Sequence, residues 1–450
     1  MFPRGEFLLT KLADLFAKGV RRYLPDAFVI AVLMTLFVLV IAIFMNLNQP
    51  ATILKSWGDG FWTYLAFTMQ MVLLLMTGMV LAAVPFINNF LRSISGFANT
   101  PKKAYIITFL VSAAAYYINW GLAVVVGAII AKEIGKRNSN VHFPLLVASA
   151  YAPTVLYTAG LSSSIGLTVA TPDHFLASVM GVIPTSETIF APGTILIFLA
   201  LVITMPIFLA LMSPKENIKS YKPLHFPKDE TALEQQAATI EEAPTPAQSL
   251  ETTPIIGLLI GAIGLLYVIY EIANGRDLDL NIINLFFLSA GLFLHRSLGQ
   301  FSNAFKEAAG SISPIILQFP FYAGIIAILT SSGLGASIID WMISIASPAS
   351  FNVFTYWTAG LVNILAPSGG GQWALQGPLQ VPAGMAIGVD PGKIAMAVGW
   401  GDAWTNLIQP FWALPILSVV GLHIRDIMGY CILLSIWVGV LTSILIFFLY

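Results

Sequence analysis

Charge, cysteine and metal-binding motifs are scarce in this sequence. Only 10% of its 450 residues are Asp, Glu, Lys or Arg, whereas a soluble domain has about 25%. The single cysteine, Cys431, excludes a disulfide framework and a cysteine-rich metal site. No His-Glu-x-x-His motif and no basic aromatic patch occur, so the sequence predicts neither a zinc hydrolase of that type nor a nucleic-acid partner.

Long hydrophobic runs are what the sequence does contain. Hydrophobic residues make up 57% of the chain and the mean hydropathy is +0.84, which indicates an all-α integral membrane protein with many spans. A helix needs about 20 apolar residues to cross a bilayer. The clear candidate spans are residues 26–45, 61–84, 193–213, 254–272, 280–296, 312–332 and 426–449.

Four further apolar regions are interrupted by polar residues, glycine or proline. Irregular backbone at membrane depth persists only inside protein or beside a water-filled cavity. We therefore predict two re-entrant hairpins, 104–137 and 353–389, and two discontinuous helices, 143–183 and 393–424. Before the first span, residues 1–25 alternate charged and apolar residues, which predicts an amphipathic helix from Phe7 to Arg22 on the membrane surface rather than a cleavable signal.

The positions of the basic residues test this arrangement. With a cytoplasmic N-terminus and hairpins that return to the face they entered from, 18 of the 21 Lys and Arg residues are cytoplasmic. Only Lys55, Arg276 and Lys393 lie outside. The positive-inside rule favours this topology, with about nine crossings, an external C-terminus and a bacterial-type inner membrane as its location.

The topology contains a repeat. The order span, span, hairpin, broken helix, span occurs in residues 26–213 and again in 280–450, and the single span 254–272 inverts the second set relative to the first. Inverted repeats with discontinuous helices are typical of secondary transporters. The segment 214–253, rich in Glu, Pro, Thr, Gln and Ala, is predicted to be a disordered cytoplasmic linker. Local matches support the repeat weakly: Asn119 with Asn363, and Pro144 with Pro391.

The hairpin breaks are candidate binding sites. Ser368, Gly369, Gly370 and Gly371 form a tip whose backbone N–H groups can face an anion, because helix N-termini carry partial positive charge. An external flexible loop is the alternative, but the long apolar flanks without basic residues favour a re-entrant tip. The remaining candidates at the two tips are Gln372, Trp373 and Gln376 in the second hairpin and Asn119, Trp120 and Gly121 in the first.

The broken helix 393–424 carries the candidate coupling residue. Asp402 is the only acid placed well inside a span, and intramembrane carboxylates are generally functional. Thr405, Asn406 and Gln409 follow it at helical spacing, or on unwound backbone between Gly399 and Pro410. These side-chain oxygens could bind Na⁺, or the Asp402 carboxylate could carry a proton. The alternative is that Asp402 has only a structural role. The break of the first repeat offers only hydroxyls, Ser162, Ser163 and Ser164, which could equally serve helix packing.

Two other function classes are weighed against a carrier. Gly399-Trp-Gly-Asp402 matches the GxGD string of intramembrane aspartyl proteases, whose chemistry needs a second carboxylate that shares a proton. The sequence has no Tyr-Asp pair and no Pro-Ala-Leu motif, so an enzyme is not expected. A passive channel would need a continuous pore, which paired hairpins would block.

These motifs resemble those of a known family. The segments Pro367-Ser-Gly-Gly-Gly-Gln-Trp373, Gly399-Trp-Gly-Asp-Ala-Trp-Thr-Asn406 and Ile118-Asn-Trp-Gly121 are similar to the short-chain fatty acid (acetoacetate/butyrate) transporters, over nearly the whole chain. The resemblance implies two inverted repeats, a moving transport part on a scaffold, and a homodimer. The Ser-Asn-Thr signatures of the related sodium-coupled dicarboxylate carriers are absent from both hairpin tips.

The hairpin tips and the second break contain no Lys or Arg, which favours a monoanionic substrate, because binding of a dianion would require a fixed cationic side chain. Trp120, Trp373, Trp400 and Trp404 are candidates to wall an apolar tail, or are ordinary core residues. The sequence therefore predicts an alternating-access symporter of short-chain monocarboxylates, with no cofactor beyond coupling Na⁺ or H⁺. A sodium-coupled dicarboxylate or citrate carrier is the alternative.

Overall fold

The described part of the protein is helical throughout. A computed structural model describes residues 25–214, 216–222, 245–295, 297–409 and 411–450, and no strand occurs in these ranges. The helix predicted from Phe7 to Arg22 lies outside them. Seven helical segments here are long and apolar enough to cross a membrane, which confirms the predicted class. They are α2 (Ala27–Met45), α4 (Leu65–Ala82), the segment Phe143–Ala170, α11 (Pro192–Leu211), α14 (Pro254–Ala273), α17 (Ser313–Ser332) and α23 (Ile424–Leu449).

Two helical hairpins occupy the regions predicted to turn back. The first comprises α6 (Pro101–Ile118) and α7 (Trp120–Arg137), and the second α19 (Pro348–Leu365) and α20 (Gly369–Ala386). Asn119 and Ser368 are the N-caps of the returning helices. Asn119 therefore corresponds to Ser368 in position and role, and the predicted match with Asn363 is wrong, because Asn363 lies within α19.

The two discontinuous helices differ in how far they unwind. The first consists of α8 (Phe143–Tyr151), the 3₁₀ helix η1 (Ala152–Ala159) and α9 (Ser164–Ala170). The second consists of α21 (Pro391–Thr405), the short η4 (Phe411–Ala413) and α22 (Leu414–Val420). The helix continues through Gly399 and Asp402, so unwinding from Gly399 is wrong. Gly401 serves close packing instead, since a Cβ there would lie 2.6 Å from Ala359 Cβ on α19.

Several helices are shorter than a membrane-spanning helix. Helix α15 (Leu280–Leu294) is apolar but has only 15 residues. The helices α3 (Pro50–Gly60), α5 (Pro85–Ser95), α16 (Leu298–Ala308) and α18 (Leu334–Ile345) have 11 or 12 residues and lie in segments expected to be connections. Other short elements are α10 (Ala177–Met180), η2 (Thr185–Glu187), α13 (Pro246–Thr252) and η3 (Ala309–Ser311).

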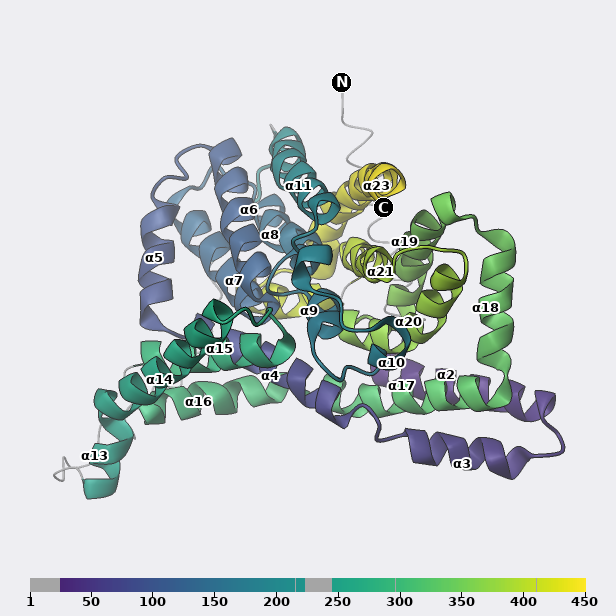
Figure 1. The fold of residues 1–450 in the computed structure, drawn as a ribbon. Coiled ribbons are helices and arrows are strands. Elements are labelled where there is room, and N and C mark those ends of the chain that lie inside the picture. The colour runs from purple at the N-terminus through teal and green to yellow at the C-terminus, as the bar shows by residue number, and fades with distance from the viewer. Residues whose placement is uncertain (1–24, 215, 223–244, 296, 410) are drawn as a thin grey trace.

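The helices form two groups that meet in the middle of the molecule. In Figure 1, α2, α3, α4, α14, α16 and α17 lie along the bottom, the hairpins and broken helices lie above them, and α5 and α18 stand at opposite ends. Contacts are exchanged between the halves of the chain: α2 packs on α17, and α15 packs on α4. The core therefore joins the halves at the level of α4 and α17.

Part of the predicted disordered linker is ordered. Pro246–Thr252 form α13, whose first turn is closed by a capping box between Thr245 and Gln248. At the other end, Lys219 accepts a backbone hydrogen bond from Phe143 (2.8 Å) and donates its own amide to His142 Nδ1 (3.2 Å). For these residues the prediction of disorder is wrong. The linker residue Lys219 is held by hydrogen bonds to His142 and Phe143, and Thr245 and Gln248 cap α13.

The contact between Gly78 and the first hairpin tip gives a stability prediction. A Cβ at Gly78 of α4 would collide with the buried Asn119 side chain. Gly78→Ala should therefore cost about 1–3 kcal/mol by overpacking. Thermal unfolding in detergent measures the loss. Gly58→Ala is the control, since a Cβ at Gly58 meets nothing within 4 Å, and an unchanged midpoint for Gly78→Ala would contradict the prediction.

His142 gives a pH prediction. Burial and the nearby Lys219 lower the pKa of His142 from 6.5 to about 4, against the opposing effect of Asp426. Between pH 6.5 and 4 the unfolded chain binds a proton that the folded protein does not, so stability falls as pH falls through this window. His142→Gln should flatten this part of the melting-temperature profile. Equal slopes for the two proteins would contradict it.

Candidate functional site

A pocket lies where both hairpin tips meet both broken helices. Its empty space is about 530 Å³, which includes its opening. The first hairpin contributes Tyr116, Trp120 and Val124, and the second hairpin contributes Ser368 and Gly369. The broken helices contribute Thr154, Tyr157, Ser164, Asn406 and Trp412, while α4 and α17 contribute Met71, Ile315 and Phe319. None of these lining residues is Lys, Arg or His.

Asp402 lies directly beside this pocket. It is fully buried, and its Oδ2 accepts a short hydrogen bond from the Tyr157 hydroxyl and a longer one from Asn406 Nδ2 (3.5 Å). Its other oxygen, Oδ1, is buried without a partner among the described residues. A Cβ at Gly369 would collide with the Tyr157 hydroxyl and lie 3.3 Å from Asp402 Oδ2. Glycine at 369 therefore lets the hairpin tip approach the carboxylate.

An oxygen cluster surrounds Asn363, which the sequence indicated only as a repeat marker. Asn363 Nδ2 lies 2.9 Å from the Asp402 carbonyl, Thr405 Oγ1 and Asn406 Oδ1. Gln409 Nε2 donates to the Asn363 carbonyl (3.0 Å). The four predicted residues of the second break thus all bind one residue of α19, Asn363, through its side-chain amide or its backbone carbonyl. Asn363 Oδ1 and Gln409 Oε1 are buried without partners in the described structure.

At the tip of the first hairpin, the Asn119 side chain forms hydrogen bonds with backbone groups. Its Oδ1 accepts from the Gly121 and Leu122 amides (2.8 and 3.1 Å), and its Nδ2 donates to the Leu74 carbonyl (2.8 Å). Gly121 is packed against α4, with the Leu75 carbonyl 2.6 Å from a Cβ placed there. Trp120 differs, because it lines the pocket while its indole N–H is buried without an acceptor in the described structure. Trp120 is therefore the residue of this tip with a donor available to a ligand.

The remaining candidates divide between the pocket and the helix core. Ser164 lines the pocket, Ser163 caps α9 through the Gly166 amide (3.0 Å), and Ser162 Oγ is buried. In the second hairpin, Gln372 donates to the Ala359 carbonyl (2.8 Å) and Gln376 to Thr358 (3.3 Å). Hence the two glutamines tie α20 to α19 and do not line the pocket.

Gly370 and Gly371 face the apolar side chains of α4 and α17. A Cβ at Gly370 would lie 3.3 Å from Met71 Cε, and one at Gly371 would lie 2.7 Å from Tyr322 Cε2. These glycines allow α4 and α17 to pack directly against the start of α20. Their role in the structure is close approach, and Gly369 alone of the three lines the pocket.

Three of the four tryptophans expected to wall the pocket do not line it. Trp373 and Trp400 are fully buried, and Trp404 stacks on Tyr356 with ring centroids 5.0 Å apart. Trp412 lines the pocket instead and meets Trp120 edge-on at 5.2 Å. Proximity to a break in sequence does not decide which face of a helix a tryptophan occupies.

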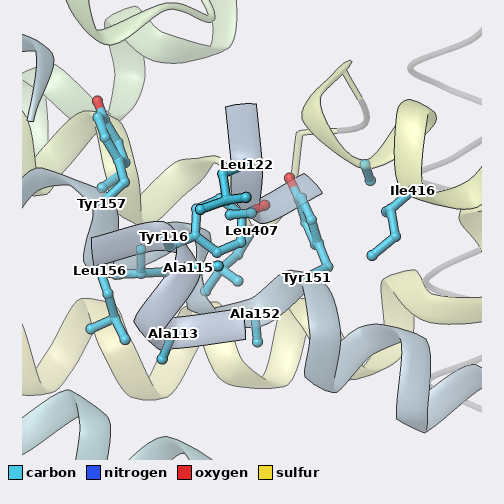
Figure 2. Packing of buried hydrophobic residues seen from close by; sticks show 14 of the residues in the cluster. Ala113, Ala115, Tyr116, Leu122, Tyr151, Ala152, Leu156, Tyr157, Leu407 and Ile416 are labelled. Carbon is cyan, nitrogen blue, oxygen red and sulfur yellow. The ribbon is translucent and has the colours of Figure 1, made fainter. Parts of the chain in front are cut away.

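The tyrosines of the first half are the main residues that the sequence analysis missed. Figure 2 shows Tyr116, Tyr151 and Tyr157 in the buried cluster that also contains Leu122 and Leu407. Tyr151 donates its hydroxyl to the Asn406 carbonyl, so both Tyr151 and Tyr157 bind the second broken helix. The position of Tyr157 inside the predicted break was the available signal. Its partner lies 245 residues away in sequence.

The chemistry of the pocket is that of binding. It offers hydroxyl, amide and indole donors, one adjacent carboxylate and several apolar side chains. The described residues contain no cluster of three or more His, Cys, Asp or Glu able to hold a metal ion. The donors and apolar side chains of the pocket suit a small, partly apolar solute.

Comparisons with known proteins agree with this geometry. The family described as short chain fatty acid transporter matches residues 8–449. A protein of Escherichia coli K12, provisionally named a short-chain fatty acid transporter, is 38% identical over 96% of this chain and 98% of its own length. One of Haemophilus influenzae Rd, with the same provisional name, is 37% identical over 98% of this chain and 100% of its own length.

Two solved structures share the fold. One is the Alcanivorax borkumensis YdaH transporter, described as having an unusual topology, with a TM-score of 0.57 and 13% identity over 95% of this chain and 99% of that chain. The other is Neisseria gonorrhoeae MtrF, described within a class of antimetabolite efflux pumps, with a TM-score of 0.52 and 15% identity over 97% of each chain. At these identities the likeness shows the fold alone.

The bond between Tyr157 and Asp402 gives a prediction. Tyr157→Phe removes the short hydrogen bond to Asp402 Oδ2 while Oδ1 stays without a partner, so we expect a loss of about 1–3 kcal/mol. The thermal unfolding midpoint in detergent measures it. Tyr116→Phe is the matched control, because Tyr116 is a buried tyrosine of the same pocket whose hydroxyl pairs with Thr154.

A double-mutant cycle sharpens this test. If Tyr157 acts through Asp402, the effects of Tyr157→Phe and Asp402→Asn should not add, whereas Tyr116→Phe and Asp402→Asn should add within about 0.5 kcal/mol. Additive effects for the Tyr157 pair would show that the hydrogen bond has no energetic role.

Proposed function

Because this chain belongs to the short-chain fatty acid transporter family, we propose that it is a secondary active symporter of short-chain monocarboxylates such as butyrate or acetoacetate. The observation that carries the proposal is the pocket where both hairpin tips and both broken helices meet. Discontinuous helices that converge at a site are the usual binding architecture of secondary transporters.

The donors of the pocket suit a single carboxylate. Ser368 and the first amides of α20 stand at a helix N-terminus, where N–H groups have no intrahelical partner and the helix dipole favours an anion. The indole N–H of Trp120 and the Ser164 hydroxyl add uncharged donors. A second carboxylate would find no cationic side chain among the lining residues. This supports a monoanion over a dicarboxylate.

The cluster around Asn363 supports cation coupling. Rotation of the Asn363 amide by half a turn would place Oδ1 among the Asp402 carbonyl, Thr405 Oγ1 and Asn406 Oδ1, making a set of four oxygens at the C-terminal end of α21. Such ends and unwound carbonyls hold Na⁺ in other transporters. Asp402 with its unpartnered oxygen is equally suited to carry a proton. Either ion would neutralise charge near the substrate carboxylate.

The helix order supports two inverted repeats. The first half runs through α2, α3, α4, α5 and the α6–α7 hairpin, and the second through α15, α16, α17, α18 and the α19–α20 hairpin. All four hairpin helices contain 18 residues. Under this proposal the hairpins and broken helices move together against the α4 and α17 group, in an elevator-like exchange between faces.

The distribution of positive charge supports a cytoplasmic N-terminus and an external C-terminus, and contacts between distant segments support the proposed grouping of segments at two faces. His295 bonds to the Val80 carbonyl (3.0 Å), and both residues lie in segments assigned to the cytoplasmic end. Thr185 donates its amide to Asp277 (2.6 Å), and both lie in segments assigned to the outside. Such pairs agree with the distribution of positive charge.

The test is uptake of labelled butyrate into proteoliposomes under an imposed proton gradient, an imposed sodium gradient or neither. Wild type should accumulate butyrate under one gradient, which identifies the coupling ion. Asp402→Asn should reduce gradient-driven accumulation about tenfold or more, as expected for loss of a charged partner. Asp390→Asn is the matched control, because exposed Asp390 caps the same helix and Asn caps equally well.

Two outcomes would contradict the proposal. Accumulation that persists in Asp402→Asn would leave the carrier but remove Asp402 from coupling. No movement of butyrate under any gradient, with wild type shown to be folded by its melting transition, would overturn the monocarboxylate substrate.

A further inference from the structure

The pocket has two chemically different sides that come from the two helix groups. Its hydroxyl and amide groups belong to the hairpins and broken helices, such as Ser164, Ser368 and Asn406. The residues from α4 and α17 are Met71, Ile315 and Phe319, which present only apolar atoms. A solute in the pocket would therefore touch one group through polar contacts and the other through apolar contacts.

The apolar side of the pocket, Met71, Ile315 and Phe319, is closely packed against a second layer of side chains. Phe319 is fully buried and stacks on Phe67 with ring centroids 5.4 Å apart. Met71 lies within 3.4 Å of a Cβ placed on Gly370, and Phe319 within 3.2 Å of one placed on Gly371. The wall therefore stands immediately beyond the hairpin tip. Because it packs against a second layer of side chains, it has little room to yield to a longer ligand.

The available donors lie on the hairpins and the first broken helix, and the apolar side chains Met71, Ile315 and Phe319 lie on α4 and α17. The buried Trp120 N–H has no acceptor in the described structure, and Ser164 lies on the same side of the pocket formed by the first half of the chain. The Gly369 and Gly370 amides have no intrahelical partner by helix geometry, whereas the Gly371 amide donates to Ser368 Oγ (3.4 Å). Within the same pocket, Ile315, Met71 and Phe319 are the apolar surface that α4 and α17 offer to the hydrocarbon tail of a fatty acid held by these groups.

We propose that Ile315, Phe319 and Met71 form the stop that limits the chain length of the transported fatty acid. This inference rests on the proposed monocarboxylate function and adds to it which residues select the substrate. Each methylene that finds an apolar site adds about fourfold in affinity, and each one that finds no room is rejected by overpacking. Removing side-chain volume at the stop should admit longer acids, and adding volume should exclude four-carbon acids.

The primary variant is Ile315→Ala, since Ile315 lies at the start of α17 and is 7% exposed. Inhibition of labelled butyrate uptake by unlabelled acetate, propionate, butyrate, hexanoate and octanoate gives the chain-length profile. In Ile315→Ala the apparent affinity for hexanoate relative to butyrate should rise about 15-fold, because two further methylenes find room and each contributes about fourfold. Direct uptake of labelled hexanoate should show the same change.

The chain offers two matched controls on the same helix. Ile316→Ala makes the same change at the next residue, whose side chain is 43% exposed and outside the pocket. Ile325→Ala removes a buried isoleucine that does not line the pocket, and so reproduces a loss of core packing. Both should keep the wild-type order of preference among the acids, even where total uptake falls.

Further variants keep the test decisive if Ile315→Ala folds poorly. Phe319→Leu should also favour hexanoate, and Ile315→Phe should favour acetate and propionate over butyrate. Val124→Ala removes volume from a pocket residue on α7, outside the α4 and α17 group. A profile that shifts in Val124→Ala and stays unchanged in the Ile315 and Phe319 variants would overturn the assignment.

Failure of this inference differs from failure of the proposed function. If wild type transports butyrate while the Ile315 and Phe319 variants keep its chain-length profile, the stop is wrong and the carrier stands. If folded wild type transports no monocarboxylate, both fall together.

Discussion

The structure depends on the need to satisfy every backbone N–H and C=O group without help from lipid. Four places interrupt the membrane-spanning helices, and lipid offers no hydrogen bond at any of them. The chain supplies the missing hydrogen bonds both from neighbouring residues and from the other half of the sequence. Asn119 and Ser163 cap the helices that restart. At the second break, Tyr151 binds the Asn406 carbonyl, and Gln409 binds the Asn363 carbonyl of α19. The interruptions are thereby forced into the protein interior, where they meet.

This constraint explains why only some polar residues near the breaks are available to a ligand. Asn119, for example, uses its side-chain oxygen and nitrogen for backbone groups. Trp120 and Asp402 each keep a buried polar atom without a partner. A fully satisfied network serves the fold, whereas an unsatisfied buried donor or acceptor is costly unless a ligand, ion or water meets it.

Close packing is the second requirement, and glycine provides it. The second hairpin tip reaches Tyr157 and Asp402 only because residue 369 has no side chain. The same principle brings α21 against α19 at Gly401, where the sequence suggested a break. The glycines of the second tip and of α21 therefore both serve tight contact, and local sequence does not distinguish that role from unwound backbone.

The sequence by itself determined the helical membrane class, the positions of the spans and hairpins, and the candidacy of Asp402, because hydrophobic length, interruption and intramembrane charge are local properties. Short helices such as α5 and α18 were missed because 11 or 12 residues lie below the length of a span. Only the tertiary structure decided that Tyr157 binds Asp402 and that Trp412 rather than Trp373 reaches the pocket. These partners lie on different helices, and which faces meet depends on packing that no local pattern specifies.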